Sequence, residues 1–174
     1  MLFEQTHGAD FEARVEEILR RVSGGRPVSI PRGPNGESYT SATIRAIPPR
    51  AELAVHVGNY FKDSDSYSHL RTFVELSDQL SYFVPLAAPD RGGELEVFSL
   101  EWHHRPRTER GDLDIDAIVR SPSTSYRPGA GDMFLFDGGR YYHRVCRVLG
   151  DRTRWTIGGF VTISKDHSEY FYWS

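Results

Sequence analysis

The chain has 174 residues, enough for one domain with a hydrophobic core, and we predict a single domain over residues 1–174. The net charge is −3 with acids and bases interspersed, which excludes the basic surface that nucleic acids or anionic membranes bind. The single cysteine, Cys146, excludes an intramolecular disulfide and a cysteine metal cluster. No apolar run approaches the ~20 residues of a membrane span and no signal-peptide layout is found, so we predict a cytoplasmic protein.

One strong helix pattern lies near the start of the chain, over about residues 10–23. Asp10 is the expected N-cap, and Gly24 is the expected stop. The apolar residues recur at helical spacing and form one stripe: Phe11, Val15, Ile18, Leu19 and Val22. We predict that this helix packs on the outside of a sheet.

The remainder of the chain is punctuated as a β protein. Segments rich in β-branched and aromatic residues, separated by Pro and Gly turns, predict about eight short strands. Residues 63–75 are predicted to form a short helix or lid, and about 103–123 a polar insertion with a helical piece near 114–119. The predicted fold class is mainly β, a double-stranded β-helix of the jelly-roll or cupin type. The predicted strands cover residues 39–47, 52–61, 79–85, 94–102, 125–127, 132–136, 141–149 and 154–164, with a further candidate at 170–173.

The predicted strand 52–61 has one face that carries no charge. Its alternation places Ala54, His56, Gly58 and Tyr60 on that face. A solvent-facing surface normally carries charged residues, so we expect this face to line a cavity.

The segment 126–164 places a histidine and an arginine near the starts of successive strands. His143 follows one turn and Arg154 follows the next. At the mouth of a β barrel, such a pair can bind a metal ion and an acidic co-substrate side by side, because a guanidinium suits a carboxylate. His56 is the predicted second metal ligand. Arg152 shares the face of Arg154 and is an alternative clamp.

These residues resemble the Fe(II)/2-oxoglutarate-dependent oxygenases, whose iron site takes two histidines and a carboxylate. The likeness covers roughly residues 41–164 and rests on order and spacing: His56, the GGEL segment from Gly92, the PGAGDMFLF run from Pro128, then His143 and the Arg154–Thr156 segment. It implies that His56 and His143 bind Fe(II), that Arg154 and Thr156 hold 2-oxoglutarate, and that O2 is the oxidant. It also implies a small-molecule substrate and no nucleic-acid or membrane partner.

The chain departs from that family at Gly58, two residues after His56, where a carboxylate ligand is expected. A His-x-Gly strand resembles the radical halogenases of the superfamily, in which a ferryl species abstracts hydrogen and a halide, such as chloride, takes the open coordination position. Two other interpretations stay open. Another carboxylate or water completes the site, or the scaffold has lost iron. The first would make the protein a hydroxylase, and the second a non-catalytic cupin-like binding module. The candidate carboxylates are Asp63, Asp65 and Asp78.

Four further residues are candidates for the substrate pocket. Asn59 and Tyr60 follow the metal-binding strand, Tyr82 lies on a neighbouring predicted strand, and Arg147 shares the parity of His143. The aromatic members are equally ordinary core residues, and Arg147 is equally an ordinary surface charge.

Overall fold

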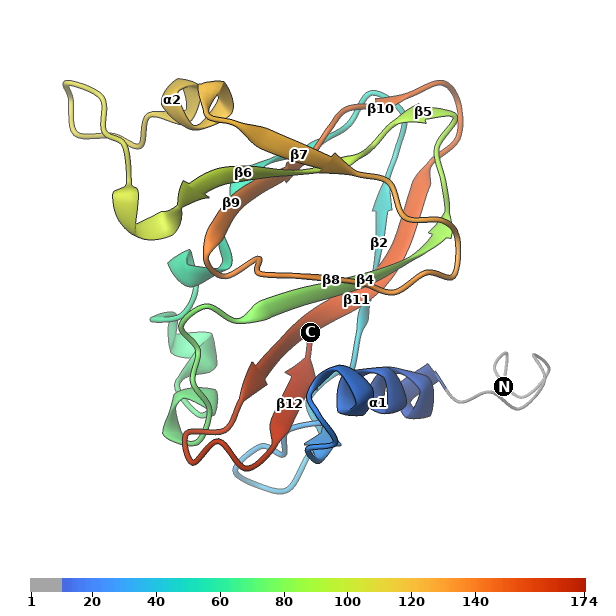
Figure 1. The fold of residues 1–174 in the computed structure, drawn as a ribbon, viewed down its shortest axis with the longest axis vertical. Helices are drawn as coiled ribbons and strands as arrows, with labels where there is room; N and C mark the ends of the chain where they lie inside the picture. Colours follow the sequence, from blue (N-terminus) through green and yellow to red (C-terminus); the bar gives the residue numbers. More distant parts are fainter. Residues whose placement is uncertain (1–10) are drawn as a thin grey trace.

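Two β-sheets face each other across the middle of the protein (Figure 1). The computed structural model describes residues 11–174. The larger sheet has the order β1-β12-β11-β4-β8, and β2 also pairs with β11. Its strands are β1 (Val28–Ser29), β2 (Thr43–Ile47), β4 (Leu80–Ala87), β8 (Phe134–Phe136), β11 (Arg154–Ile163) and β12 (Tyr170–Trp173).

The smaller sheet has the order β3-β9-β6-β7, and a short pair, β5 with β10, lies at one end of the barrel. All pairings except that of β1 with β12 are antiparallel. This confirms the predicted mainly β, jelly-roll architecture. The strands here are β3 (Leu53–His56), β5 (Arg91–Gly92), β6 (Leu95–Glu101), β7 (Ser123–Tyr126), β9 (Tyr141–Val145) and β10 (Val148–Leu149).

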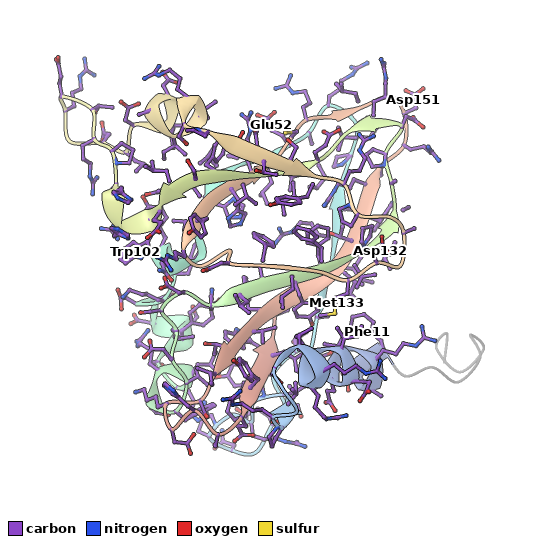
Figure 2. The ribbon with its side chains drawn as sticks, viewed as in Figure 1. Phe11, Glu52, Trp102, Asp132, Met133 and Asp151 are labelled. Carbon is purple, nitrogen blue, oxygen red and sulfur yellow. The ribbon has the colours of Figure 1, made fainter. Side chains whose placement is uncertain are left out.

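Helix α1 (Phe11–Val22) covers the outer face of the larger sheet, as predicted. Its stripe buries Val15 and Leu19 against Tyr82, Val161 and Tyr172. Figure 2 shows Phe11 and Met133 on this same side of the sheet. The helix therefore closes one outer face and leaves the opposite face to the barrel interior. Asp10, its predicted N-cap, lies outside the described residues.

The outer face of the smaller sheet is closed by the predicted insertion. Its helical piece is α2 (Ile115–Arg120), and Ile118 is fully buried. Val57, Phe98 and Tyr142 pack around Ile118 in one apolar cluster. Helix α1 and the insertion thus cover the outer faces of the two sheets. The alternate residues of each strand point into the space between the sheets.

The predicted strand 52–61 is shorter in the structure. β3 ends at His56, and residues Gly58–Tyr60 form a single 3-10 turn, η1. The turn is fixed because the Gly58 and Asn59 amides donate to the carbonyls of Gly138 and Gly139, rather than to a neighbouring strand. The side chains therefore do not alternate between two strand faces beyond His56. Gly58 and Tyr60 do not share a strand face with Ala54, and this prediction was wrong.

Most other predicted elements lie near their predicted positions, with the following differences. Residues 63–75, predicted to form a short helix or lid, contain two 3-10 turns, η2 (Asp65–Tyr67) and η3 (Leu70–Thr72), instead of an α-helix. A third such turn, η4 (Trp102–His104), follows β6. The predicted strand 141–149 is divided into β9 and β10. Within residues 11–174, no helix has the length and apolar character needed to cross a membrane.

Candidate functional site

Two histidines of the smaller sheet stand side by side on its inner face. His56 ends β3 and is the cross-strand partner of His143 on β9. The centroids of the two rings are 4.1 Å apart, and the ring planes are inclined by 58°. Residues directly opposite on antiparallel strands project to the same face, which explains how imidazoles so far apart in sequence converge. The structure thus brings together the two predicted metal ligands.

Each imidazole is oriented by its own backbone. His56 Nδ1 lies 2.8 Å from the Ala54 carbonyl oxygen, and His143 Nδ1 lies 2.9 Å from that of Tyr141. With Nδ1 donating its proton to the carbonyl, the Nε2 lone pair is left to bind a cation. Metal-binding histidines typically have this second hydrogen bond, which fixes tautomer and ring direction.

Both histidines are held neutral, which is the form that ligates a metal. His143 is only 5% exposed, and burial lowers its pKa to about 3, with the neighbouring His56 adding to the effect. Burial also lowers the pKa of His56, partly opposed by its bond to Ala54. Neither ring then carries a proton that would have to leave before a cation binds.

The position two residues after His56 leaves almost no room for a side chain. A Cβ on Gly58 would lie 3.1 Å from Gln79 Nε2, 3.1 Å from Gly139 Cα and 3.2 Å from the Gly138 carbonyl oxygen. Contacts of that length require the neighbours to yield by a few tenths of an ångström. Gly58 is therefore a close-packed position against Gln79, Gly138 and Gly139.

Among the residues that the structure describes, no third protein ligand accompanies the two histidines. Within residues 11–174, no group of three or more His, Cys, Asp or Glu side chains is arranged to hold a metal ion. The Asp78 carboxylate instead accepts a 2.8 Å hydrogen bond from the Asn59 side chain, and Asp63 and Asp65 are exposed. The described part of the chain thus offers two imidazoles with open positions beside them.

Arg154 is a buried cation without an anionic partner. It begins β11, is 8% exposed, and makes no ion pair with any residue of the described chain. Burial, followed by the charge of Arg45, lowers the pKa of Arg154 to about 10, which leaves the guanidinium charged at neutral pH. An unpaired buried charge is costly, so Arg154 is a position at which an anion would be stabilised.

The space around Arg154 is narrow. The guanidinium lies 5.2 Å from the centroid of the Phe83 ring, and Thr156, 5% exposed, is two residues along the same strand. A hollow of about 20 Å³ adjoins Arg154, room for about one water molecule. Gly93 has φ +71°, and its backbone lies close to the Arg154 side chain. A Cβ on Gly93 would lie 3.1 Å from Arg154 Cδ, so a larger residue would crowd the arginine.

Three phenylalanines connect the histidine pair with the arginine. Phe136 packs edge-on against His143 at 5.0 Å, and Phe83 lies 6.5 Å from Phe136 and 5.6 Å from Phe134. Sequence reasoning missed these rings and Gln79. The sequence did indicate which residues share a face, because Gln79 and Phe83 have the same parity along one strand, and Phe134 and Phe136 along another. It did not indicate which face is the inner one, since that depends on the strands and sheets that pack against them.

The remaining predicted site residues lie elsewhere. Arg152 is an exposed partner of Asp90, so Arg154 is the arginine that faces the interior. Tyr82 is not a pocket residue: it is buried under α1, where its hydroxyl donates to the Ser41 carbonyl oxygen. Arg147 is exposed and pairs with Glu52, so it does not line the pocket either.

Asn59 and Tyr60 have mainly structural contacts. The Asn59 side chain bonds both the carboxylate and the backbone amide of Asp78, which ties η1 to the start of β4. Tyr60 is 41% exposed, and its hydroxyl contacts that of Tyr142 on the outer face of the smaller sheet. Their predicted pocket role fails because the strand they were assigned to ends at His56.

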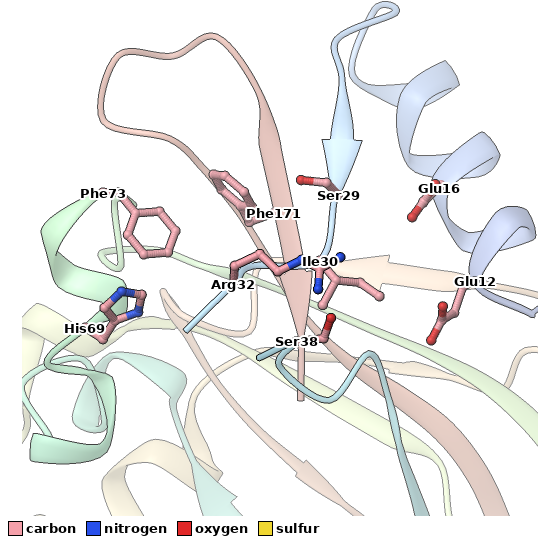
Figure 3. Close-up of a pocket in the computed structure, with 9 residues that line it drawn as sticks. All are labelled: Glu12, Glu16, Ser29, Ile30, Arg32, Ser38, His69, Phe73 and Phe171. Carbon is pink, nitrogen blue, oxygen red and sulfur yellow. The ribbon is translucent and has the colours of Figure 1, made fainter. Parts of the chain in front are cut away.

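A larger hollow lies on another face of the protein (Figure 3). It measures about 680 Å³ and is bordered by α1, β1 and β12. Neither the histidine pair nor Arg154 lines this hollow, and its lining combines acidic, basic, hydroxyl and apolar side chains. The residues that line it are Glu12, Glu16, Ser29, Ile30, Arg32, Ser38, His69, Phe73 and Phe171.

Comparison with solved structures supports the architecture. An N-substituted L-amino acid dioxygenase from Burkholderia ambifaria AMMD aligns with a TM-score of 0.60 at 19% identity, over 91% of this chain and 64% of that one. The structure of that dioxygenase in complex with alpha-KG gives a TM-score of 0.58 at the same identity and coverage. The chain therefore spans 64% of the length of these relatives. At this identity the likeness establishes the fold alone.

No curated protein matches the chain. A sequence model of a known family does match, and it extends over residues 1–174, the full length of the sequence. Its description is the carrier-protein-independent halogenase WelO5. The chain belongs to the WelO5 family of carrier-protein-independent halogenases.

Proposed function

We propose that the protein is an Fe(II)- and 2-oxoglutarate-dependent halogenase that acts on a small molecule. The observation that carries this proposal is the facing pair His56 and His143, with both Nδ1 atoms tied to backbone carbonyls and no third protein ligand among residues 11–174. Two neutral imidazoles with a glycine beside them suit an iron whose remaining positions are taken by co-substrate, oxygen and a halide.

Arg154 is the proposed clamp for the far carboxylate of 2-oxoglutarate. Its charge is buried and unpaired, and its planar group can donate two parallel hydrogen bonds to a carboxylate. Thr156 is the proposed hydroxyl partner. Phe83, Phe134 and Phe136 place apolar rings between this anchor and the histidines, and such surroundings would strengthen polar contacts made there.

When bound together, iron, 2-oxoglutarate and O2 supply an oxidant able to remove hydrogen from an unactivated carbon. The chain's part is to orient these groups, keep both imidazoles unprotonated and, because Gly58 offers no carboxylate, leave one coordination position of the iron free for chloride or another halide. A hydroxylase with a displaced or absent carboxylate ligand is the rival, and residues 11–174 bring no carboxylate to join the two histidines as a third ligand.

Anaerobic addition of 2-oxoglutarate to the Fe(II)-loaded protein is expected to produce a weak visible charge-transfer band. With air, chloride and a panel of N-substituted amino acids, the class named for the structural relative, we expect a product with a chlorine isotope pattern. A hydroxylated product that is unaffected by chloride would establish the rival. Absence of both the band and retained iron would remove the enzymatic interpretation.

Arg154→Gln is expected to weaken 2-oxoglutarate binding by about 10- to 100-fold, the loss of one or two charge-assisted hydrogen bonds. The measurement is the apparent Kd from anaerobic titration of the band. Arg152→Gln is the matched control, because Arg152 is exposed and pairs with Asp90. A loss in the Arg152 variant, with Arg154→Gln unchanged, would move the clamp to Arg152.

A further inference from the structure

Arg45 is a second cation on the inner face of the larger sheet. It lies on β2 directly opposite Thr156 of β11, and Ile47 on the same strand lies opposite Arg154. Residues directly opposite on antiparallel strands project to the same face, and so do residues two apart on one strand. Arg45 therefore shares its face with Thr156 and Arg154, both of which are buried.

Unlike these two neighbours, Arg45 is open to solvent. Strand β2 pairs with β11 and with no other strand of the described chain, so one of its edges is free. The Arg45 side chain is exposed, and it makes no ion pair with any residue between positions 11 and 174. Arg45 thus stands at the open side of the site, whereas Arg154 stands at its closed side.

The charge of Arg45 acts on both parts of the site. Burial is the main cause that lowers the pKa of His56, of His143 and of Arg154, and the positive charge of Arg45 lowers the pKa of each further. A charge that acts on the histidine pair and on the opposite arginine lies close to the space between them. This agrees with the strand register, which places Arg45 on the inner face.

The proposed co-substrate has no carboxylate left for this cation. 2-Oxoglutarate carries two carboxylates, and the proposed function assigns the far one to Arg154 and the near one to iron. An inward-pointing charge on an edge strand can also serve to discourage pairing with another chain. That role needs only a positive charge, whereas binding a carboxylate makes use of the planar guanidinium, which can donate two parallel hydrogen bonds.

We infer that Arg45 determines substrate specificity by binding a carboxylate of the substrate at the open side of the site. The substrate class is then small molecules that carry a carboxylate. The inference rests on the proposed function and adds the residue that selects an acidic substrate over a neutral one. Because Arg45 is exposed, we expect it to contribute to affinity without being needed for iron or 2-oxoglutarate binding.

The test measures binding of N-acetyl amino acids and of their uncharged carboxamides to the anaerobic Fe(II)·2-oxoglutarate complex by isothermal titration calorimetry. The wild-type protein should bind the acids about tenfold more tightly than the amides, and Arg45→Gln should abolish this preference by weakening acid binding alone. Arg45→Lys keeps the charge without the planar group and should retain only part of the preference. Arg120→Gln is the matched control, because it removes an exposed, unpaired arginine on the outer helix α2.

The inference is overturned if the wild-type protein binds none of the acids, or binds acids and amides equally. It is also overturned if Arg45→Gln keeps the wild-type preference, or if that variant loses 2-oxoglutarate affinity, which would make Arg45 a co-substrate contact. Each of these results leaves the proposed halogenase intact. Failure of the proposed function has a different signature, because wild-type protein would then retain no iron and show no charge-transfer band. Thermal unfolding of each apo-protein checks the fold, and Arg45→Lys decides if Arg45→Gln does not fold.

Discussion

Replacing His143 by alanine is expected to abolish stoichiometric Fe(II) binding. Only two protein ligands are proposed for the ion, so removing one leaves a single imidazole, His56, which cannot hold a divalent metal against water. His143 is the more buried of the two, and its Nδ1 is fixed by the Tyr141 carbonyl. The measurement is iron per protein after Fe(II) loading and anaerobic gel filtration, together with loss of the 2-oxoglutarate charge-transfer band.

His104→Ala is the matched control for this experiment. His104 is exposed in the turn η4 and makes no contact with the histidine pair, so that variant is expected to keep wild-type iron content. Circular dichroism of both apo-proteins checks that the fold is retained. Full iron content in folded His143→Ala protein would show that the metal site lies elsewhere.

Gly58→Asp is expected to convert the site from halide binding to carboxylate ligation. The aspartate would stand two residues after His56 and offer the oxygen ligand that residues 11–174 do not bring to the histidines. Chloride should then no longer shift the charge-transfer band, and the chlorinated-to-hydroxylated product ratio should fall by at least about tenfold, a change of about 1.4 kcal/mol. The new Cβ must displace Gln79 Nε2 and the backbone at Gly138 and Gly139 slightly, so we also expect lower thermal stability.

Gly58→Ala separates the steric effect from the chemical one. It introduces the same Cβ contacts without a carboxylate, so chloride should still shift the band, although more weakly. If Gly58→Asp keeps the wild-type response to chloride, the halide does not bind beside Gly58. If alanine and aspartate abolish the response equally, crowding rather than ligand exchange explains the effect.

The sequence by itself determined most element types and the β architecture, and it predicted the candidate site residues. The helix stripe at 11–22 is a local property, and so are the turns that separate the strands, because Gly and Pro fix backbone geometry independently of partners. His56, Gly58, His143 and Arg154 could be selected because residue type and spacing along short strands carry their chemistry. The choice between Arg154 and Arg152 also followed from local spacing, and the buried position of Arg154 agrees with it.

The tertiary structure alone decided which face each residue occupies. Strand 52–61 ends early because Gly58 and Asn59 bond to Gly138 and Gly139, residues about 80 positions away, and no local pattern reports such a pairing. The same holds for Tyr82, which lies under α1, and for Gln79, whose amide meets Gly58 only in the folded chain. Side-chain periodicity gives two faces but does not say which is interior. That assignment depends on long-range contacts between sheets, which form only on folding.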